Sequence, residues 1–182
     1  MVALSLSSAD HAELLEQYPY PFKIVARYTI DSEKVAVSYE VTNEGTEDMP
    51  FFVGGHPGFK CPLDEGESYD DYELRFEQRE ATELCTAVPS TGLIDVEHRS
   101  KNPMIGQNLP LTHELFDFAE TIFDVLESRV VTLTKKTEDK GVRLTFPDMP
   151  YLIVWSKPEG DFVAVEPWGG CLLYTSDAAD DL

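Results

Sequence analysis

Alternation of apolar and polar residues with a period of two constrains this chain more than any other feature of its sequence. It is clearest over residues 22–30 and 34–42, which the short polar segment Asp31-Ser-Glu33 connects. Successive side chains of a β-strand point to opposite faces of a sheet, so this alternation predicts two strands that each bury one face. The short connection predicts that the two strands pair as an antiparallel hairpin.

Further segments carry a strand signal and are separated by residues typical of turns. The predicted strands cover residues 50–53, 72–78, 81–86, 129–134, 142–146, 151–156 and 162–166. The predicted turns are Asn43-Glu-Gly45, Pro89-Ser-Thr-Gly92, Asp139-Lys-Gly141 and Pro158-Glu-Gly160. About nine short strands with this spacing predict an all-β, antiparallel β-sandwich or barrel. Only a turn or two of helix is expected within residues 10–18 and 111–118, and residues 86–109 are expected to form a long irregular loop.

Composition restricts the class of protein further. The 182 residues include 34 acidic and 14 basic side chains, for a formal charge of −20, and 42% of them are hydrophobic. This is enough apolar material for one packed domain. The negative charge repels phosphate backbones and anionic lipid, which argues against binding to nucleic acid or to a membrane. The three cysteines have no short spacing and fit neither a disulfide framework nor a zinc site, so we expect a cytoplasmic protein.

The composition changes abruptly after Gly170. Residues 171–182 resemble no protein family, but the first ten of them, residues 171–180, match the translation of a transposon-type sequencing adaptor, TGT CTC TTA TAC ACA TCT GAC GCT GCC GAC. We therefore expect a domain over residues 1–170 and a non-native tail over residues 171–182 that has no part in fold or function. A natural, disordered acidic tail is the alternative.

A histidine in a turn rich in glycine and proline is the first candidate for chemistry. His56 stands in the segment Phe51-Phe-Val-Gly-Gly-His-Pro-Gly-Phe-Lys-Cys-Pro62, where the glycines and prolines impose a tight, stiff path. Histidine has an unperturbed pKa near neutrality, so a firmly held imidazole suits a general acid. The alternative is a partly buried histidine that only makes hydrogen bonds within the turn.

A carboxylate at the end of an apolar strand is the second candidate. In Phe162-Val-Ala-Val-Glu166 every residue except Glu166 is apolar, which predicts a strand covered on both faces. Burial raises the pKa of a carboxyl group toward values useful to a general base. The alternative is a glutamate that reaches solvent or a basic partner. Trp168, two residues further on, is placed to offer an aromatic face to a C–H-rich ligand such as a pyranose, whereas Trp155 is interpreted as a core residue.

The remaining residues give weaker signals. His11, His98 and His113 lack a supporting motif and are interpreted as surface or capping residues. Metal-ligand spacings and glycine-rich nucleotide fingerprints are absent from the sequence, so no metal or cofactor is expected.

Three blocks of sequence together resemble the aldose 1-epimerase (galactose mutarotase) family, in its LacX-like branch. They are Phe52-Val-Gly-Gly-His-Pro-Gly-Phe-Lys-Cys-Pro62, Asp148-Met-Pro-Tyr-Leu-Ile-Val-Trp-Ser-Lys-Pro158 and Phe162-Val-Ala-Val-Glu-Pro-Trp-Gly169. The resemblance implies a galactose mutarotase-like β-sandwich that interconverts the α and β anomers of an aldohexose without a cofactor. It implies that His56 is the general acid that protonates the ring oxygen and that Glu166 is the general base that accepts the proton of the C1 hydroxyl. A non-catalytic sugar-binding or sugar-sensing module on the same fold is the alternative.

Two features depart from the family pattern. Family members have an N-terminal portion with several strands, a substrate-binding Arg and another pocket His, so we expect this chain to be a C-terminal fragment with an incomplete sandwich and negligible activity alone. Relatives also carry an Asp before an apolar stretch, where this chain offers Ala119 or Glu120, with Asp117 nearby. Glu120 and Asp117 are therefore the candidates for the contact with a sugar hydroxyl. A phosphorylated hexose is disfavoured because few basic residues lie near the motifs.

Overall fold

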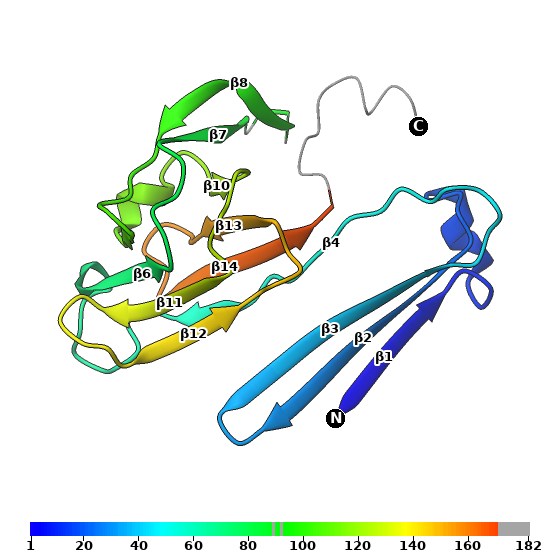
Figure 1. Ribbon diagram of the computed structural model, residues 1–182, viewed down its shortest axis with the longest axis horizontal. Coiled ribbons are helices and arrows are strands. Elements are labelled where there is room, and N and C mark those ends of the chain that lie inside the picture. The colour runs from blue at the N-terminus through cyan, green and yellow to red at the C-terminus, as the bar shows by residue number, and fades with distance from the viewer. Residues whose placement is uncertain (89, 92, 171–182) are drawn as a thin grey trace. The chain divides into compact units, whose positions relative to one another are not determined.

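The computed structural model describes residues 1–88, 90–91 and 93–170. The chain divides into two compact units, residues Met1–Phe51 and a second unit that begins at Phe52. Nearly all of the regular structure is β, and every strand pair is antiparallel (Figure 1). The predicted all-β, antiparallel class is confirmed. The expected tail over residues 171–182, and two residues of the predicted turn at 89–92, lie outside the described residues.

The first unit contains a three-stranded sheet in the order β1–β2–β3. Its strands are β1 (Val2–Ser7), β2 (Phe22–Asp31) and β3 (Lys34–Asn43), and the short 3-10 helix η1 (Ala12–Glu16) follows β1. The predicted hairpin is confirmed, because β2 and β3 pair along their whole length and Asp31 pairs with Lys34 at the turn. Strand β1 was not predicted, since a single short segment rich in serine gives little signal.

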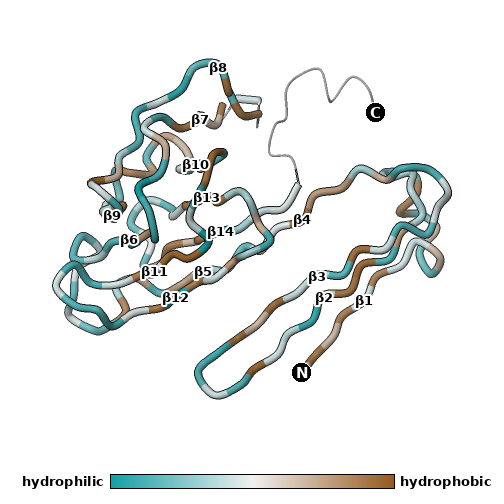
Figure 2. The backbone as a smooth tube through the Cα atoms, viewed as in Figure 1, coloured by the Kyte–Doolittle hydropathy of each residue, from teal (hydrophilic) through white to brown (hydrophobic). Residues whose placement is uncertain are grey.

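One face of this sheet is apolar and exposed. The register aligns alternate residues of the three strands on that face, so Leu4 pairs with Ala26 and Ala26 with Tyr39. Its exposed large apolar side chains range in exposed fraction from 37% for Tyr28 to 74% for Ile30. Other large apolar side chains on the same face are partly buried, namely Ile24, Tyr39 and Val41. Figure 2 shows the resulting alternation of hydrophobic and hydrophilic residues along these strands. Large exposed apolar faces of this kind favour association with other surfaces.

The second unit is a sandwich of two sheets. The larger sheet has seven strands in the order β4–β14–β13–β10–β7–β8, with β5 also paired to β14, and the smaller has four in the order β12–β11–β6–β9. The strands are β4 (Val53–Gly54), β5 (Gly58–Lys60), β6 (Tyr72–Phe76), β7 (Glu83–Val88), β8 (Leu93–Lys101), β9 (Asn108–Pro110), β10 (Thr121–Phe123), β11 (Val130–Lys135), β12 (Gly141–Thr145), β13 (Tyr151–Trp155) and β14 (Phe162–Gly169). Two 3-10 helices, η2 (Tyr69–Asp71) and η3 (His113–Phe116), complete it, and η3 matches the short helix expected within 111–118.

The core of this unit lies between the two sheets. Alternate residues of β13 and β14, among them Leu152 and Val165, meet Leu74 and Val131 from the smaller sheet in one buried cluster. This alternation leaves the other residues of β13 and β14 on the opposite face of the larger sheet. That second face carries the candidate site.

Several predicted boundaries were wrong. Residues 86–109 hold strands β8 and β9 in place of the expected loop. Strand β4 covers residues 53–54 and not 50–53, and the three-residue strands β5 and β10 were missed. Strand β14 continues to Gly169, so Glu166 lies inside the strand and not at its end.

Candidate active site

His56 stands in the turn between β4 and β5, the two short strands that pair with β14. Gly54 of β4 pairs with Trp168, and the pairing of β5 continues in the same register on the far side of the turn. Extending this register across the turn brings His56 opposite Glu166. Directly opposite residues of antiparallel strands place their side chains on the same face, so the sheet itself brings the two candidates together.

Backbone hydrogen bonds fix the turn on both sides of His56. The amide of Gly55 donates to the carbonyl of Pro167 at 3.0 Å, and the amide of Val165 donates to the carbonyl of Pro57 at 3.1 Å. The broken strand therefore stays attached to β14 while the imidazole projects from the break.

The two side chains make a direct contact with very unequal burial. Nε2 of His56 lies 3.1 Å from Oε1 of Glu166, and the side chains are 62% and 6% exposed, respectively. Burial raises the pKa of Glu166; the neighbouring His56 opposes this shift, and the negative charge of Glu120 adds to it. The result is a buried carboxylate with increased proton affinity beside an imidazole that a ligand can reach.

Trp168 packs flat against Gly54. A Cβ atom at Gly54 would lie 2.2 to 2.7 Å from three carbons of the indole, so only glycine permits this approach. The indole also packs against the small cluster around Ile122 on the same face of the sheet. Its buried Nε1 makes no hydrogen bond of standard geometry to the residues that the structure describes, yet it lies close enough to Glu166 to lower that pKa. The ring face toward Gly54 is therefore closed to a ligand.

The two carboxylates predicted to contact the sugar differ in position. Glu120 directly precedes β10, is exposed, and acts electrostatically on Glu166. Asp117 is exposed at the end of η3, and its charge is not among those that act on Glu166 within the described chain. The structure thus brings Glu120, but not Asp117, into electrostatic contact with the candidate pair.

Strand β13 adds residues that sequence analysis did not assign to the site. Ile153 pairs with Glu166, so Tyr151 and Trp155, two residues away on either side, share its face. Trp155, interpreted as core, is half-buried on this face. Trp155 can be assigned to this face because side chains alternate along β13, and Ile153, two residues before it, pairs with Glu166.

The other candidate residues take no part in this cluster. His11 and His98 make exposed contacts with nearby carboxylates, and the ring of His113 stacks on Tyr69 at 4.2 Å. Cys61 and Cys85 are free and buried, and burial raises the pKa of each thiol to about 12. Such thiols are poor nucleophiles at neutral pH.

The described part of the chain holds neither a candidate metal cluster nor a membrane-spanning helix. No group of three or more His, Cys, Asp and Glu side chains there is arranged to hold a metal ion. None of its helices is long and apolar enough to cross a membrane.

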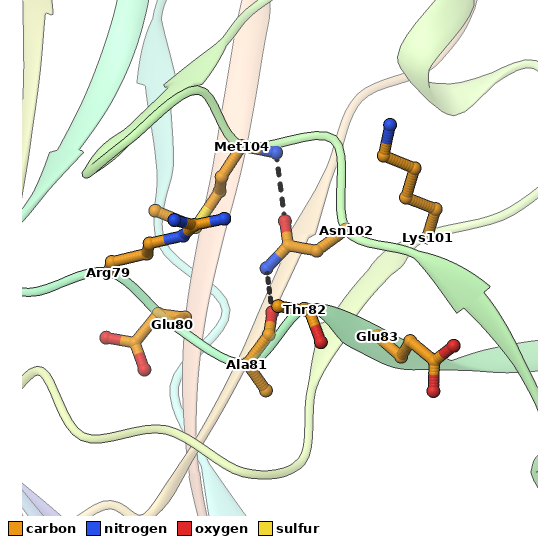
Figure 3. A pocket seen from close by; sticks show the side chains of 8 residues that line it. All are labelled: Arg79, Glu80, Ala81, Thr82, Glu83, Lys101, Asn102 and Met104. Atoms are coloured by element: carbon orange, nitrogen blue, oxygen red, sulfur yellow. Dashed lines mark hydrogen bonds between the residues drawn. The ribbon is translucent and has the colours of Figure 1, made fainter.

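A cavity of about 400 Å³ lies next to β7 and β8, and no predicted site residue lines it. Asn102 spans it by donating to the carbonyl of Ala81 and accepting from the amide of Met104 (Figure 3). Arg79 and Lys101 lie on opposite sides of Asn102 and do not converge. This cavity is therefore separate from the His56 cluster in both lining and chemistry.

Comparison with known proteins decides the family. The family model for aldose 1-epimerase matches residues 1–181. The chain belongs to the aldose 1-epimerase family. It is 39% identical over 170 residues to the chromosomal and plasmid LacX proteins of Lactococcus lactis subsp. lactis, covering 92% of this chain and 57% of each LacX protein.

Solved structures show the same relationship. A galactose mutarotase-like protein from Lactobacillus casei ATCC 334 is 30% identical with a TM-score of 0.74, and the match covers 91% of this chain and 56% of that one. A galactose mutarotase related enzyme from Lactobacillus acidophilus is 26% identical with a TM-score of 0.76, covering 92% and 55%. The resemblance and the galactose mutarotase-like fold are confirmed, and the chain spans little more than half the length of these relatives.

Proposed function

We propose that this chain forms part of a mutarotase that interconverts the α and β anomers of a hexose, with His56 as general acid and Glu166 as general base. The observation that carries the proposal is the contact between an exposed imidazole and a buried carboxylate on one sheet face. Family membership supplies the sugar as the class of substrate.

Mutarotation requires two proton transfers around one carbon atom. Glu166 removes the proton of the C1 hydroxyl while His56 donates a proton to the ring oxygen, and the bond between C1 and the ring oxygen breaks. The aldehyde rotates about C1–C2 and closes on its other face as both protons return. The two oxygens are bonded to the same carbon, so an acid and a base that stand side by side can serve both.

Unequal burial separates the two roles. Glu166 is desolvated, which raises its pKa and makes its carboxylate a stronger base than an exposed glutamate. His56 is open to solvent, so an incoming sugar can reach Nε2 and replace its contact with Glu166. The sugar then receives one hydrogen bond from the imidazole and donates one to the carboxylate.

Polarimetry on fresh α-galactose or α-glucose tests the proposal. We expect substantial activity when this chain is joined to the part of LacX that it does not match, and negligible activity from the 182-residue chain alone. Positioning of the sugar contributes as much as about 7–11 kcal/mol to such reactions, and a partial pocket supplies little of it.

Two variants of the joined protein make the test specific. Glu166→Gln should lower the rate by roughly 10²- to 10⁴-fold because it removes the base. Glu97→Gln, the same change at an exposed position of β8, should leave it unaltered. Equal rates for Glu166→Gln and the parent would refute the assignment and favour a sugar-binding module.

A further inference from the structure

We infer that Trp155 is the stacking platform of the sugar site and that the site selects a neutral, unphosphorylated pyranose. The inference rests on the proposed function, because it names the substrate class of the same site. It begins from a large aromatic side chain whose position neither the hydrophobic core nor the proton-transfer pair explains.

Trp155 lies on the site face, one step along the sheet from the candidate base. It pairs with Ala164, and Ile153 pairs with Glu166, so the two pairs are adjacent on one face. Two residues along a strand span about 7 Å, which is the scale of one pyranose ring. A sugar whose C1 lies over Glu166 can therefore reach Trp155.

The surroundings of the indole hold it in place without enclosing it. Phe162 meets it at a centroid distance of 5.7 Å and an interplanar angle of 64°. Its neighbours across the sheet are small, Ala164 and then Gly58, which is itself exposed. Trp155 belongs to neither of the two hydrophobic clusters found in the described residues. A ring already fixed in this way loses little conformational entropy when a ligand stacks on it.

Trp168 is the less suitable of the two tryptophans. One face of its indole is covered by Gly54, and the ring packs into the cluster around Ile122. Trp155 has no corresponding cover from a glycine backbone or from that cluster. The sugar platform is thus assigned to Trp155, and Trp168 is assigned to holding β4 against β14.

The charges near the platform determine which sugars it accepts. Thr121 pairs with Val154, so Glu120 comes next in register, beside Trp155. The carboxylates of Glu120 and Glu166 accept hydrogen bonds from hydroxyl groups and repel a phosphate group. His56 is the basic side chain that acts on Glu166 in the described chain, and no Lys or Arg joins it there. This chemistry fits a ring with hydroxyl groups and no anionic substituent.

Intrinsic fluorescence and calorimetry of the 182-residue chain test the inference. The chain contains 2 tryptophans, Trp155 and Trp168, and both lie on the site face, so its emission reports on that face. The probe is methyl α-D-galactopyranoside, whose blocked anomeric centre cannot be epimerised, so binding is measured apart from catalysis. We expect a saturable change in emission for the parent chain.

Substitutions identify the ring responsible. Trp155→Leu should weaken binding roughly three- to tenfold, Trp155→Phe should retain most of the affinity, and Tyr28→Leu, an aromatic change in the first unit, should have no effect. Galactose 6-phosphate should bind at least about tenfold more weakly than the galactoside. Circular dichroism verifies that each variant is folded, and Trp155→Phe keeps the test valid if Trp155→Leu unfolds.

Several results would overturn the inference. They are unchanged affinity in folded Trp155→Leu, or loss of most of the affinity in Trp155→Phe. Equal affinity for galactose 6-phosphate and for the galactoside, or no saturable response in the parent chain, would also overturn it. Binding that depends on Trp155, together with a rate unchanged by Glu166→Gln, would instead refute the proposed function and leave the platform standing.

Discussion

Replacing Gly54 with alanine should disturb the site more than the addition of one methyl group suggests. The new Cβ would lie 2.2 Å from Cδ2, 2.4 Å from Cε3 and 2.7 Å from Cε2 of Trp168. Carbon atoms in contact are normally about 3.5–4.0 Å apart, so the indole or β4 must move by about 1 Å. Strand β4 pairs with β14 at only two positions, and loosening them would release His56 from its place opposite Glu166.

The expected cost follows from this overlap. Overpacking of a fitted contact typically costs about 1–3 kcal/mol, which for a unit of this size lowers Tm by about 3–15 °C. Gly58→Ala is the matched control on the other side of His56. A Cβ there would meet only Phe162 Cδ2 at 3.8 Å, an ordinary contact. Neither glycine has a positive φ, so alanine can adopt both backbone conformations, and Gly58→Ala should change stability by less than about 0.5 kcal/mol.

Thermal unfolding followed by circular dichroism measures the difference between the two variants. Tryptophan emission supplies a local readout, because a displaced Trp168 changes its environment in Gly54→Ala and not in Gly58→Ala. The same Tm and the same emission spectrum for both variants would refute the close packing of Trp168 on Gly54.

Three further predictions concern other parts of the molecule. Burial raises the pKa of Glu166 above its ordinary value of 4.5, so the folded chain holds this proton more tightly; the corresponding stability is present below pH 4.5 and is lost as pH rises through the raised pKa. As pH increases, the free energy of unfolding measured with urea should therefore fall less in Glu166→Gln than in the parent. Parallel dependences of this free energy on pH in the two proteins would contradict the burial of Glu166. Leu4→Lys, on the apolar face of the first unit, should reduce binding of a hydrophobic dye and light scattering, and unchanged scattering would show that this face is already covered. Deleting residues 171–182 should leave the polarimetric rate of the joined protein unchanged, and a lower rate would show that this segment contributes to the site.

The parts of the fold predictable from sequence are those where a local pattern is strong. Residues 22–30 and 34–42 alternate over many residues and are joined by a tight turn, which fixes the hairpin without distant contacts. Strand β8 could not be found this way, because its second half, Glu97-His-Arg-Ser-Lys101, is exposed and keeps no apolar face. Strand β10 is only three residues long and fully buried, so it shows no period at all.

The same limit applies to the candidate site: only its locally encoded parts could be predicted. His56 and Glu166 could each be singled out from local sequence, one by its Gly/Pro turn and the other as the lone charge in an apolar strand. Their contact could not, because it depends on β4 and β5 sharing one register with β14. Trp155 was misinterpreted as core because it ends an apolar run, and only the pairing of β13 with β14 reveals that its face is the site face.

The interrupted edge strand explains how one sheet can hold an exposed imidazole against a buried carboxylate. An unbroken strand opposite Glu166 would bring a side chain into the regular pleat, where its neighbours would cover it. The break between β4 and β5 leaves backbone bonds on both sides of His56 intact while its ring stays 62% exposed. Glu166 lies inside β14, between that edge and β13, and is therefore desolvated. Strand pairing thus sets the distance between the two groups, and the break in the edge strand sets the difference in burial on which their proposed roles depend.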